Sequence, residues 1–136
     1  MKDFSGDKIR VLLTRHLLEG HDMGLRSIVN GCREAGIEVV YYPRFNDFNE
    51  VVKVAEEEDV DMIGISSSSG AHLHLSEGVI SALKQRNMET PIIIGGVIPD
   101  KDTFMLKHSG IKGIFGPGST PGEVADFIFE FMGKQA

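Results

Sequence analysis

Short apolar runs alternate along the chain with stretches in which apolar residues recur every three or four positions. The short runs are bounded by glycine, proline or polar residues, which is typical of buried strands, whereas the longer spacing marks one face of a helix. The pattern predicts strands at 9–14, 38–42, 61–66, 91–95 and 111–115. It predicts helices through 25–35, 48–55, 75–83, 102–109 and 124–131.

This alternation of five strands and five helices indicates an α/β fold. Strands that are apolar almost throughout need cover on both faces, as in a parallel sheet, and right-handed crossovers then give a doubly wound arrangement. We predict a five-stranded parallel sheet of the flavodoxin-like (Rossmann-like) type with strand order 2-1-3-4-5. No linker or internal repeat interrupts the pattern, so residues 1–136 are expected to form a single domain with its core at about 8–132.

The composition narrows the class of protein. The chain has 136 residues, 41% of them hydrophobic and 25% charged, which is ordinary for a globular domain. A formal net charge of −6 disfavours binding to nucleic acid or to an anionic membrane. No apolar run reaches the roughly 20 residues of a membrane span, the polar N-terminus has no signal-peptide core, and one cysteine excludes a disulfide framework. These features predict a cytoplasmic protein with no membrane or nucleic-acid partner.

Candidate chemistry lies in the loops that follow the strands, because ligands of open parallel sheets bind beyond the carboxyl ends of the strands. Three of these loops consist mainly of small residues: SSSSGA at 66–71, GG at 95–96 and GPGST at 116–120. Glycine and serine there leave room for a slot and offer N–H and O–H donors. Such a slot favours a long ligand that enters beside the sheet.

The loop after the first strand adds a histidine and a carboxylate. Glu19 precedes His21 by two residues, and Gly20 and Gly24 allow tight turns. A metal-ligating histidine commonly donates its second ring N–H to a carboxylate, which fixes the tautomer. One histidine without a nearby cysteine disfavours a zinc site built from protein alone. A single imidazole can still serve as an axial ligand to a metal that a macrocycle holds.

Taken together, these loops resemble those of the cobalamin (vitamin B12)-binding domain of the acyl-CoA mutases, the methylmalonyl-CoA mutase family. The family pattern is DxHxxG after the first strand, SxL after the third and GG after the fourth. Here the three segments are EGHDMG at 19–24, SSS at 66–68 and GG at 95–96, and the match covers about residues 8–132. Glu19 and Ser68 replace the family's Asp and Leu, and Arg15 and Leu17 stand where the family usually has Lys and Gly.

The resemblance implies how a cofactor is bound. His21 is the lower axial ligand of cobalt, in place of the cofactor's own base, and Ser66 hydrogen-bonds that displaced base in the slot. The two glycines at 95–96 let the tail pass close to the backbone. The cofactor-binding residues implied in this way are Glu19, Gly20, His21, Asp22, Met23, Gly24, Ser66, Ser68, Gly70, Gly95, Gly96, Gly116 and Gly118. No residue of the chain is expected to be catalytic.

The function implied is that of the small subunit of a radical acyl-CoA mutase, which binds adenosylcobalamin and catalyses nothing alone. A large catalytic subunit with an acyl-CoA-binding barrel is the implied partner. The alternative is a corrinoid protein that carries methyl groups for a methyltransferase, which is disfavoured because only about eight residues precede the first strand, too few for a helical cap. A phospho-accepting signalling domain is disfavoured because Ser66 stands where its aspartate is needed.

The remaining histidines and the cysteine have simpler interpretations. His16 either packs in the interior or contacts the cofactor. His72 and His74 begin a helix, and one of them is a candidate for the cofactor's edge. His108 is structural near a helix end, where a cation is favourable. Cys32 lies on an apolar helical face and is expected to be an inert core thiol.

Overall fold

The computed structural model describes residues 8–16, 23–67 and 70–135 of the chain. Strands and helices alternate in the predicted order, and all neighbouring strands are parallel. The strand order is β2-β1-β3-β4-β5, which confirms the predicted topology. The strands are β1 (Arg10–His16), β2 (Glu38–Phe45), β3 (Met62–Ser67), β4 (Ile92–Gly96) and β5 (Gly113–Phe115). The helices are α1 (Met23–Glu34), α2 (Phe48–Glu57), α3 (His72–Gln85), α4 (Asp100–Ser109) and α5 (Pro121–Gln135).

The strand bounds differ from those expected by one to three residues, and the differences in β2 and β5 have a structural consequence. β2 continues past residue 42 to Phe45 and includes Pro43. Proline lacks a backbone donor, but β2 is an edge strand with β1 as its single neighbour, where a missing donor is tolerated. β5 is shorter than predicted, since only Gly113–Phe115 has strand geometry. Ile111 is nevertheless buried in the core, as its apolar character suggested.

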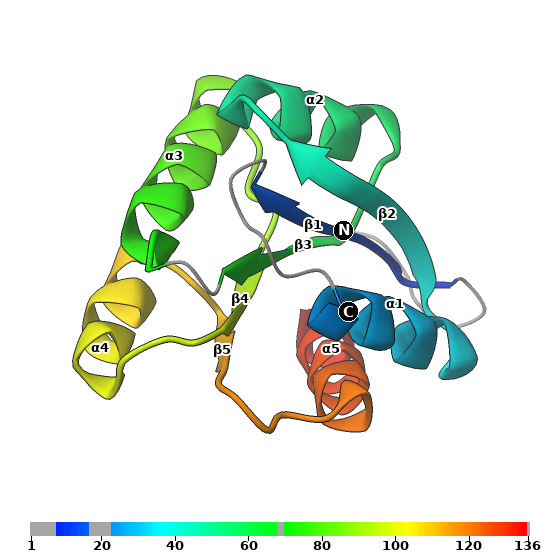
Figure 1. Ribbon diagram of the computed structural model, residues 1–136. Helices are drawn as coiled ribbons and strands as arrows, with labels where there is room; N and C mark the ends of the chain where they lie inside the picture. The colour runs from blue at the N-terminus through cyan, green and yellow to red at the C-terminus, as the bar shows by residue number, and fades with distance from the viewer. Residues whose placement is uncertain (1–7, 17–22, 68–69, 136) are drawn as a thin grey trace.

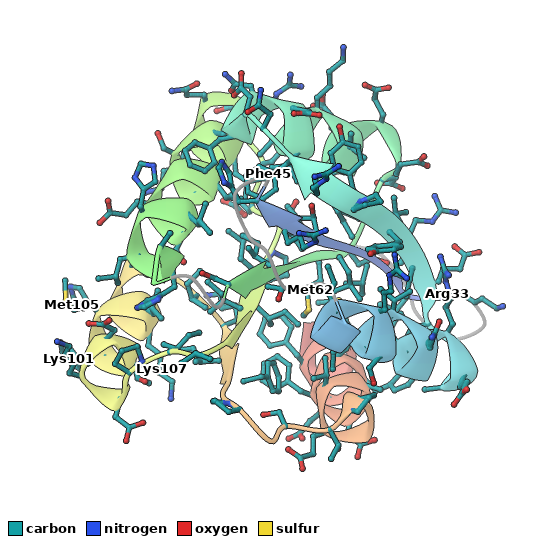
Figure 2. The ribbon with its side chains drawn as sticks, in the orientation of Figure 1. Arg33, Phe45, Met62, Lys101, Met105 and Lys107 are labelled. Carbon is teal, nitrogen blue, oxygen red and sulfur yellow. The ribbon has the colours of Figure 1, made fainter. Side chains whose placement is uncertain are left out.

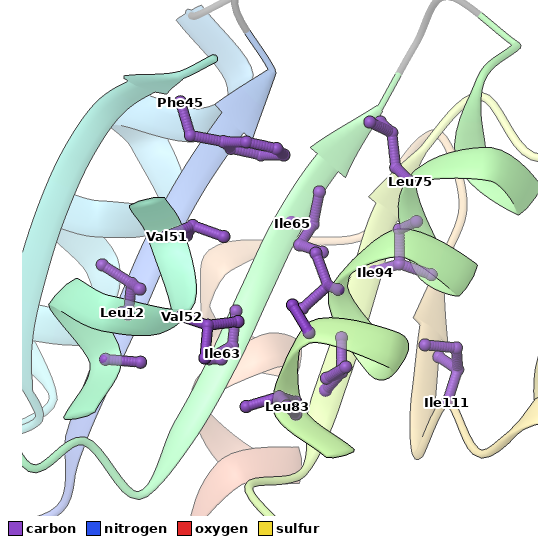
Figure 3. Packing of buried hydrophobic residues seen from close by; sticks show 14 of the residues in the cluster. Leu12, Phe45, Val51, Val52, Ile63, Ile65, Leu75, Leu83, Ile94 and Ile111 are labelled. Atoms are coloured by element: carbon purple, nitrogen blue, oxygen red, sulfur yellow. The ribbon is translucent and has the colours of Figure 1, made fainter. Parts of the chain in front are cut away.

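Helices cover the sheet on both faces (Figure 1). Successive residues of a strand point to opposite faces, so Ile63 and Ile65 of β3 pack with α2 and α3, whereas Met62 packs with α1 and α5. The first of these cores includes fully buried Phe45, at the carboxyl end of β2 (Figure 3). The sheet therefore separates two cores, and its carboxyl edge can present different surroundings on each side.

Glycine allows close packing between helices on both faces. A Cβ atom at Gly78 of α3 would lie 2.2 Å from the ring of Phe48 in α2. A Cβ at Gly31 of α1 would lie 2.2 Å from Cβ of Pro121 in α5. Neither separation is sterically possible, so these two helix contacts require the absence of a side chain.

α4 is the helix with the least apolar attachment to the body of the protein. Leu106 is its buried residue, whereas Phe104 is 76% exposed and Met105 is also exposed. Figure 2 places Met105 on the outer side of α4, together with Lys101. The position of α4 therefore depends strongly on its polar contacts. Over the described residues, no helix is long and apolar enough to cross a membrane.

Candidate functional site

A cavity of about 240 Å³ opens at the carboxyl ends of the strands, on the side covered by α1 and α5. Four of the five strands contribute to it: Leu13 from β1, Ser66 from β3, Gly95 from β4 and Phe115 from the edge strand β5. Ser66 faces this side because it alternates with Ile65, which belongs to the opposite core. The cavity therefore lies where the sheet rule and the sequence motifs both predicted a ligand.

Missing side chains keep the cavity open. A Cβ at Gly24, in the first turn of α1, would meet no atom within 4 Å. The same holds for Gly116 and Gly118 in the loop between β5 and α5. All three glycines line the cavity, so any larger residue at these positions would extend into its space.

The adjacent glycines at the end of β4 have different structural roles. A Cβ at Gly95 would lie 3.4 Å from the carbonyl oxygen of Phe115, which is tight but possible. A Cβ at Gly96 would lie 1.9 Å from the carbonyl oxygen of Ser67, and Gly96 has φ of +133°. The pairing of β3 with β4 thus requires glycine at 96 whether or not a ligand is bound. Both residues line the cavity.

The cavity lining suits a flat apolar group with polar edges. Aliphatic side chains and the ring of Phe115 form its walls, and Ser66 and Ser119 add hydroxyl groups. Phe115 is held edge-on against Phe127, with ring centroids 5.4 Å apart. Sites for drug-sized ligands occupy about 300–1,000 Å³. A cavity below that range fits one aromatic base of a cofactor tail, but it cannot enclose a corrin ring.

The structure brings together six of the predicted cofactor-binding residues as cavity lining: Gly24, Ser66, Gly95, Gly96, Gly116 and Gly118. Gly70 is exposed and is not among the described residues that line this cavity. Met23 begins α1. The other five lie outside the described residues: Glu19, Gly20, His21, Asp22 and Ser68.

Sequence reasoning did not identify Phe115 or Ser119 as lining residues. Their positions in the sequence could have indicated this role, because both residues flank the predicted Gly116–Gly118 segment at the end of the last strand. It also missed the contact between His72 and Asp102, in which Nε2 of His72 lies 2.7 Å from Oδ2 of Asp102. These two residues are distant in sequence, and no local pattern links them.

Three further histidines among the described residues, and the cysteine, have packing contacts. The ring of His16 meets Phe45 edge-on at 5.3 Å, that of His74 meets Phe48 at 5.6 Å, and that of His108 stacks on Phe104 at 5.9 Å. Cys32 is fully buried, as predicted, and desolvation raises the pKa of its thiol to about 11. Within the part of the chain that the structure describes, no three His, Cys, Asp or Glu side chains gather as metal ligands.

Comparison with known families assigns the chain. The model of the B12 binding domain matches residues 9–125. The chain belongs to the B12-binding domain family. Its resemblance to a cobalamin-binding domain is thereby confirmed, and the relatives described next confirm that the resemblance is to this domain of the acyl-CoA mutases.

Small subunits of CoA mutases are among the similar proteins. The pivalyl-CoA mutase small subunit of Xanthobacter autotrophicus is 37% identical over 88% of this chain and 81% of its own length. The 2-hydroxyisobutanoyl-CoA mutase small subunit of Aquincola tertiaricarbonis is 35% identical over 88% of this chain and 89% of its own. Methylmalonyl-CoA mutase of Escherichia coli is 33% identical over 85% of this chain, which corresponds to 16% of that enzyme.

Solved structures support the fold. A cobalamin-binding protein from Desulfitobacterium hafniense has a TM-score of 0.78 at 16% identity, over 92% of this chain and 60% of that one. A response-regulator receiver domain from Francisella has a TM-score of 0.73 at 16% identity, over 95% of this chain and 100% of that one. At this identity the shared feature is the fold, and the B12-binding assignment depends on the family match.

Proposed function

We propose that this B12-binding domain binds adenosylcobalamin as the small subunit of an acyl-CoA mutase, with His21 as the lower ligand of cobalt. The observation that carries the proposal is the cavity of about 240 Å³ at the carboxyl edge of the sheet, kept open by glycine on several sides. The mutase small subunits among its relatives favour this function over that of a methyl carrier for a methyltransferase.

The described residues receive the tail of the cofactor. Ser66 and Phe115 line the cavity, which supports a hydrogen bond from the Ser66 hydroxyl to the displaced base and an aromatic contact of that base with Phe115. Gly116 and Gly118 leave room for the rest of the tail at the mouth. Binding the tail in this cavity leaves the corrin ring outside it, where His21 is proposed to ligate the cobalt.

The catalytic work is shared with a partner. Adenosylcobalamin supplies radical chemistry when bound, and the protein's part is to bind and orient it. We propose that a large catalytic subunit, whose barrel binds the acyl-CoA, completes the active site in the cytoplasm. Glu19 supports His21 by accepting its second ring N–H, and Gly20, Asp22, Met23, Ser68 and Gly70 are proposed to complete the surroundings of the cofactor.

The decisive experiment replaces the proposed cobalt ligand. Cobalamin mixed with the wild-type chain is expected to show the absorption spectrum of a base-off, histidine-ligated corrinoid, and His21→Ala is expected to lose it. His108→Ala is the matched control, because His108 lies on α4 and stacks only on exposed Phe104. An unchanged spectrum in His21→Ala rejects His21 as the ligand.

The carboxylate partner is tested separately. Partners of a metal-ligating histidine typically contribute about 10–100-fold to metal affinity. Glu19→Gln is therefore expected to weaken cobalamin binding within that range, measured by spectroscopic titration. Equal affinity in the wild type and the variant places Glu19 away from His21.

A further inference from the structure

His72 and Asp102 form a close and largely buried pair. The ring Nε2 of His72 lies 2.7 Å from Oδ2 of Asp102, and the two side chains are 3% and 16% exposed. The pairs Arg10–Glu38 and Arg86–Glu56, in contrast, are largely open to solvent. A hydrogen bond to an ionised group is stronger than a neutral one, and more so away from water.

The pair connects the beginnings of two helices that have no caps of their own. α2 begins with a full capping box, in which Asp47 accepts from the N–H of Asn49 at 2.8 Å. Ahead of α5, Oγ1 of Thr120 accepts from the N–H of Glu123 at 3.1 Å. At α3 and α4 the cap residues are Ala71 and Pro99, and neither makes a side-chain cap.

These two helices follow the strands that end at the cavity. His72 is the first residue of α3, a few positions after Ser66, and Asp102 is in the first turn of α4, a few positions after Gly95. Figure 1 shows α3 and α4 side by side on one flank of the sheet. Because α4 makes few apolar contacts with the rest of the protein, the hydrogen bond between Asp102 and His72 fixes the position of the start of α4. It thereby also fixes the path of the chain between Gly96 and α4.

We infer that the His72–Asp102 pair is a positioning device for the cofactor cavity, which holds the ends of β3 and β4 in the geometry that the cofactor tail requires. The inference rests on the proposed function, because it assigns these residues a role in cobalamin binding. Neither residue lines the cavity, so both act through Ser66, Gly95 and Gly96.

The burial of the serine hydroxyls at 67 and 76 supports a structural role of the pair over a catalytic one. Among the described residues, Nδ1 of His72 and the Oγ atoms of Ser67 and Ser76 have no hydrogen-bond partner. Serine, histidine and aspartate together are also the components of a hydrolase triad. Here Ser67 and Ser76 are 0% and 1% exposed, so no substrate can reach their hydroxyls.

Variants of two aspartates in the same helix turn test the inference. Asp102→Ala removes the acceptor for His72, whereas Asp100→Ala removes an exposed carboxylate from the same turn of α4. Both variants lose one favourable charge at the helix N-terminus. A difference between them in cobalamin affinity or in hydrogen exchange therefore reports the contact with His72. Asp102→Asn keeps an oxygen acceptor and is the conservative variant.

Cobalamin affinity is the first measurement. Asp102→Ala is expected to bind at least about tenfold more weakly, as for loss of a charge-assisted hydrogen bond. Asp102→Asn should recover part of that loss, and Asp100→Ala should stay within about twofold of the wild type. If Asp102→Ala does not fold, Asp102→Asn carries the test. Wild-type affinity in both Asp102 variants overturns the inference.

Hydrogen exchange of the cofactor-free protein is the second measurement, and it does not depend on the proposed function. The amides at 72–76 and 97–102 are expected to exchange faster in the Asp102 variant, while those of β1 keep their protection. Equal acceleration in β1 shows a general stabilising role and overturns local positioning. If the wild type fails to bind cobalamin, the proposed function fails while the exchange result still reports on the pair.

Discussion

Two regions of the molecule use glycine in opposite ways. On the face of α2 and α3, the place of a missing side chain at Gly78 is taken by the ring of Phe48. At the carboxyl edge on the face of α1 and α5, the places of missing side chains at Gly24, Gly116 and Gly118 face open space. Glycine admits a neighbour from the same chain in the first region and keeps a cavity for a ligand in the second.

The open region does not reflect loose packing of that face as a whole. Pro121 of α5 occupies the space that a side chain at Gly31 of α1 would need. The ring of Phe127 does the same at Gly113. At the base of the cavity, a Cβ at Gly64 would lie 2.5 Å from Cδ2 of Leu13. Open space lies beside Gly24, Gly116 and Gly118, all of which line the cavity, and this favours a binding role for it. Substitutions that add one side chain at a time can test this contrast.

The largest effect is expected where glycine is in contact with backbone. Gly96→Ala places a Cβ 1.9 Å from the carbonyl oxygen of Ser67 and leaves alanine at φ of +133°. Overpacking and backbone strain each cost about 1–3 kcal/mol, so the free energy of unfolding should fall by about 3 kcal/mol or more. Urea denaturation measures it, with Gly95→Ala as the neighbouring control. A variant as stable as the wild type contradicts the close approach of β3 and β4.

A smaller loss is expected where glycine meets a side chain. Gly78→Ala forces the Phe48 ring to move, at a cost of about 1–3 kcal/mol in unfolding free energy. The double variant with Phe48→Leu should recover part of the loss. Cobalamin affinity of the folded protein should not change, because Gly78 lies on the other face. Additive effects in the double variant contradict the contact.

A side chain added in the open region is expected to weaken cobalamin binding and to leave the stability of the fold nearly unchanged. Gly116→Val adds a side chain into cavity space and should leave the unfolding free energy within about 0.5 kcal/mol of the wild type. Cobalamin affinity should fall about tenfold or more, since the tail loses room, which corresponds to about 1.4 kcal/mol. Gly122→Ala is the control, because Gly122 is in α5 and does not line the described cavity. Unchanged affinity in Gly116→Val places the tail elsewhere.

The sequence could predict this fold because each element is locally encoded. The run DMIGIS defines β3 by its apolar character, and Gly110 ends α4 in a left-handed conformation. The strand order followed from general rules for parallel sheets. The loop motifs placed most of the cavity's glycines, because carboxyl ends of parallel strands share one edge.

Contacts between distant segments could not be predicted in this way. The distinction between Gly95 and Gly96 depends on the register that sets Gly96 opposite Ser67. The pairing of His72 with Asp102 depends on how α3 packs against α4. The role of His21 remains a prediction from the motif and its family, which the spectrum of His21→Ala tests directly.

The smallest effect concerns Cys32, which lies in the closed part of the α1 and α5 face. Burial raises the pKa of its thiol to about 11, so the folded state favours the neutral form. That contribution is fully present below the thiol's ordinary pKa of 9.0 and is lost as the pH rises towards 11. Between pH 8 and 10 the wild type should therefore lose about 1 kcal/mol more unfolding free energy than Cys32→Ala.

Comparison of the two proteins isolates this thiol. Tyrosine and lysine side chains also titrate at alkaline pH, but they do so equally in the wild type and in Cys32→Ala. The alanine variant has a cavity cost of its own, which does not depend on pH and leaves the slope unaffected. Urea midpoints across this range give the difference. If the unfolding free energies of the wild type and Cys32→Ala change in parallel with pH, water reaches Cys32. The open cavity would then extend further along α1 than the packing of Val29 and Cys32 indicates.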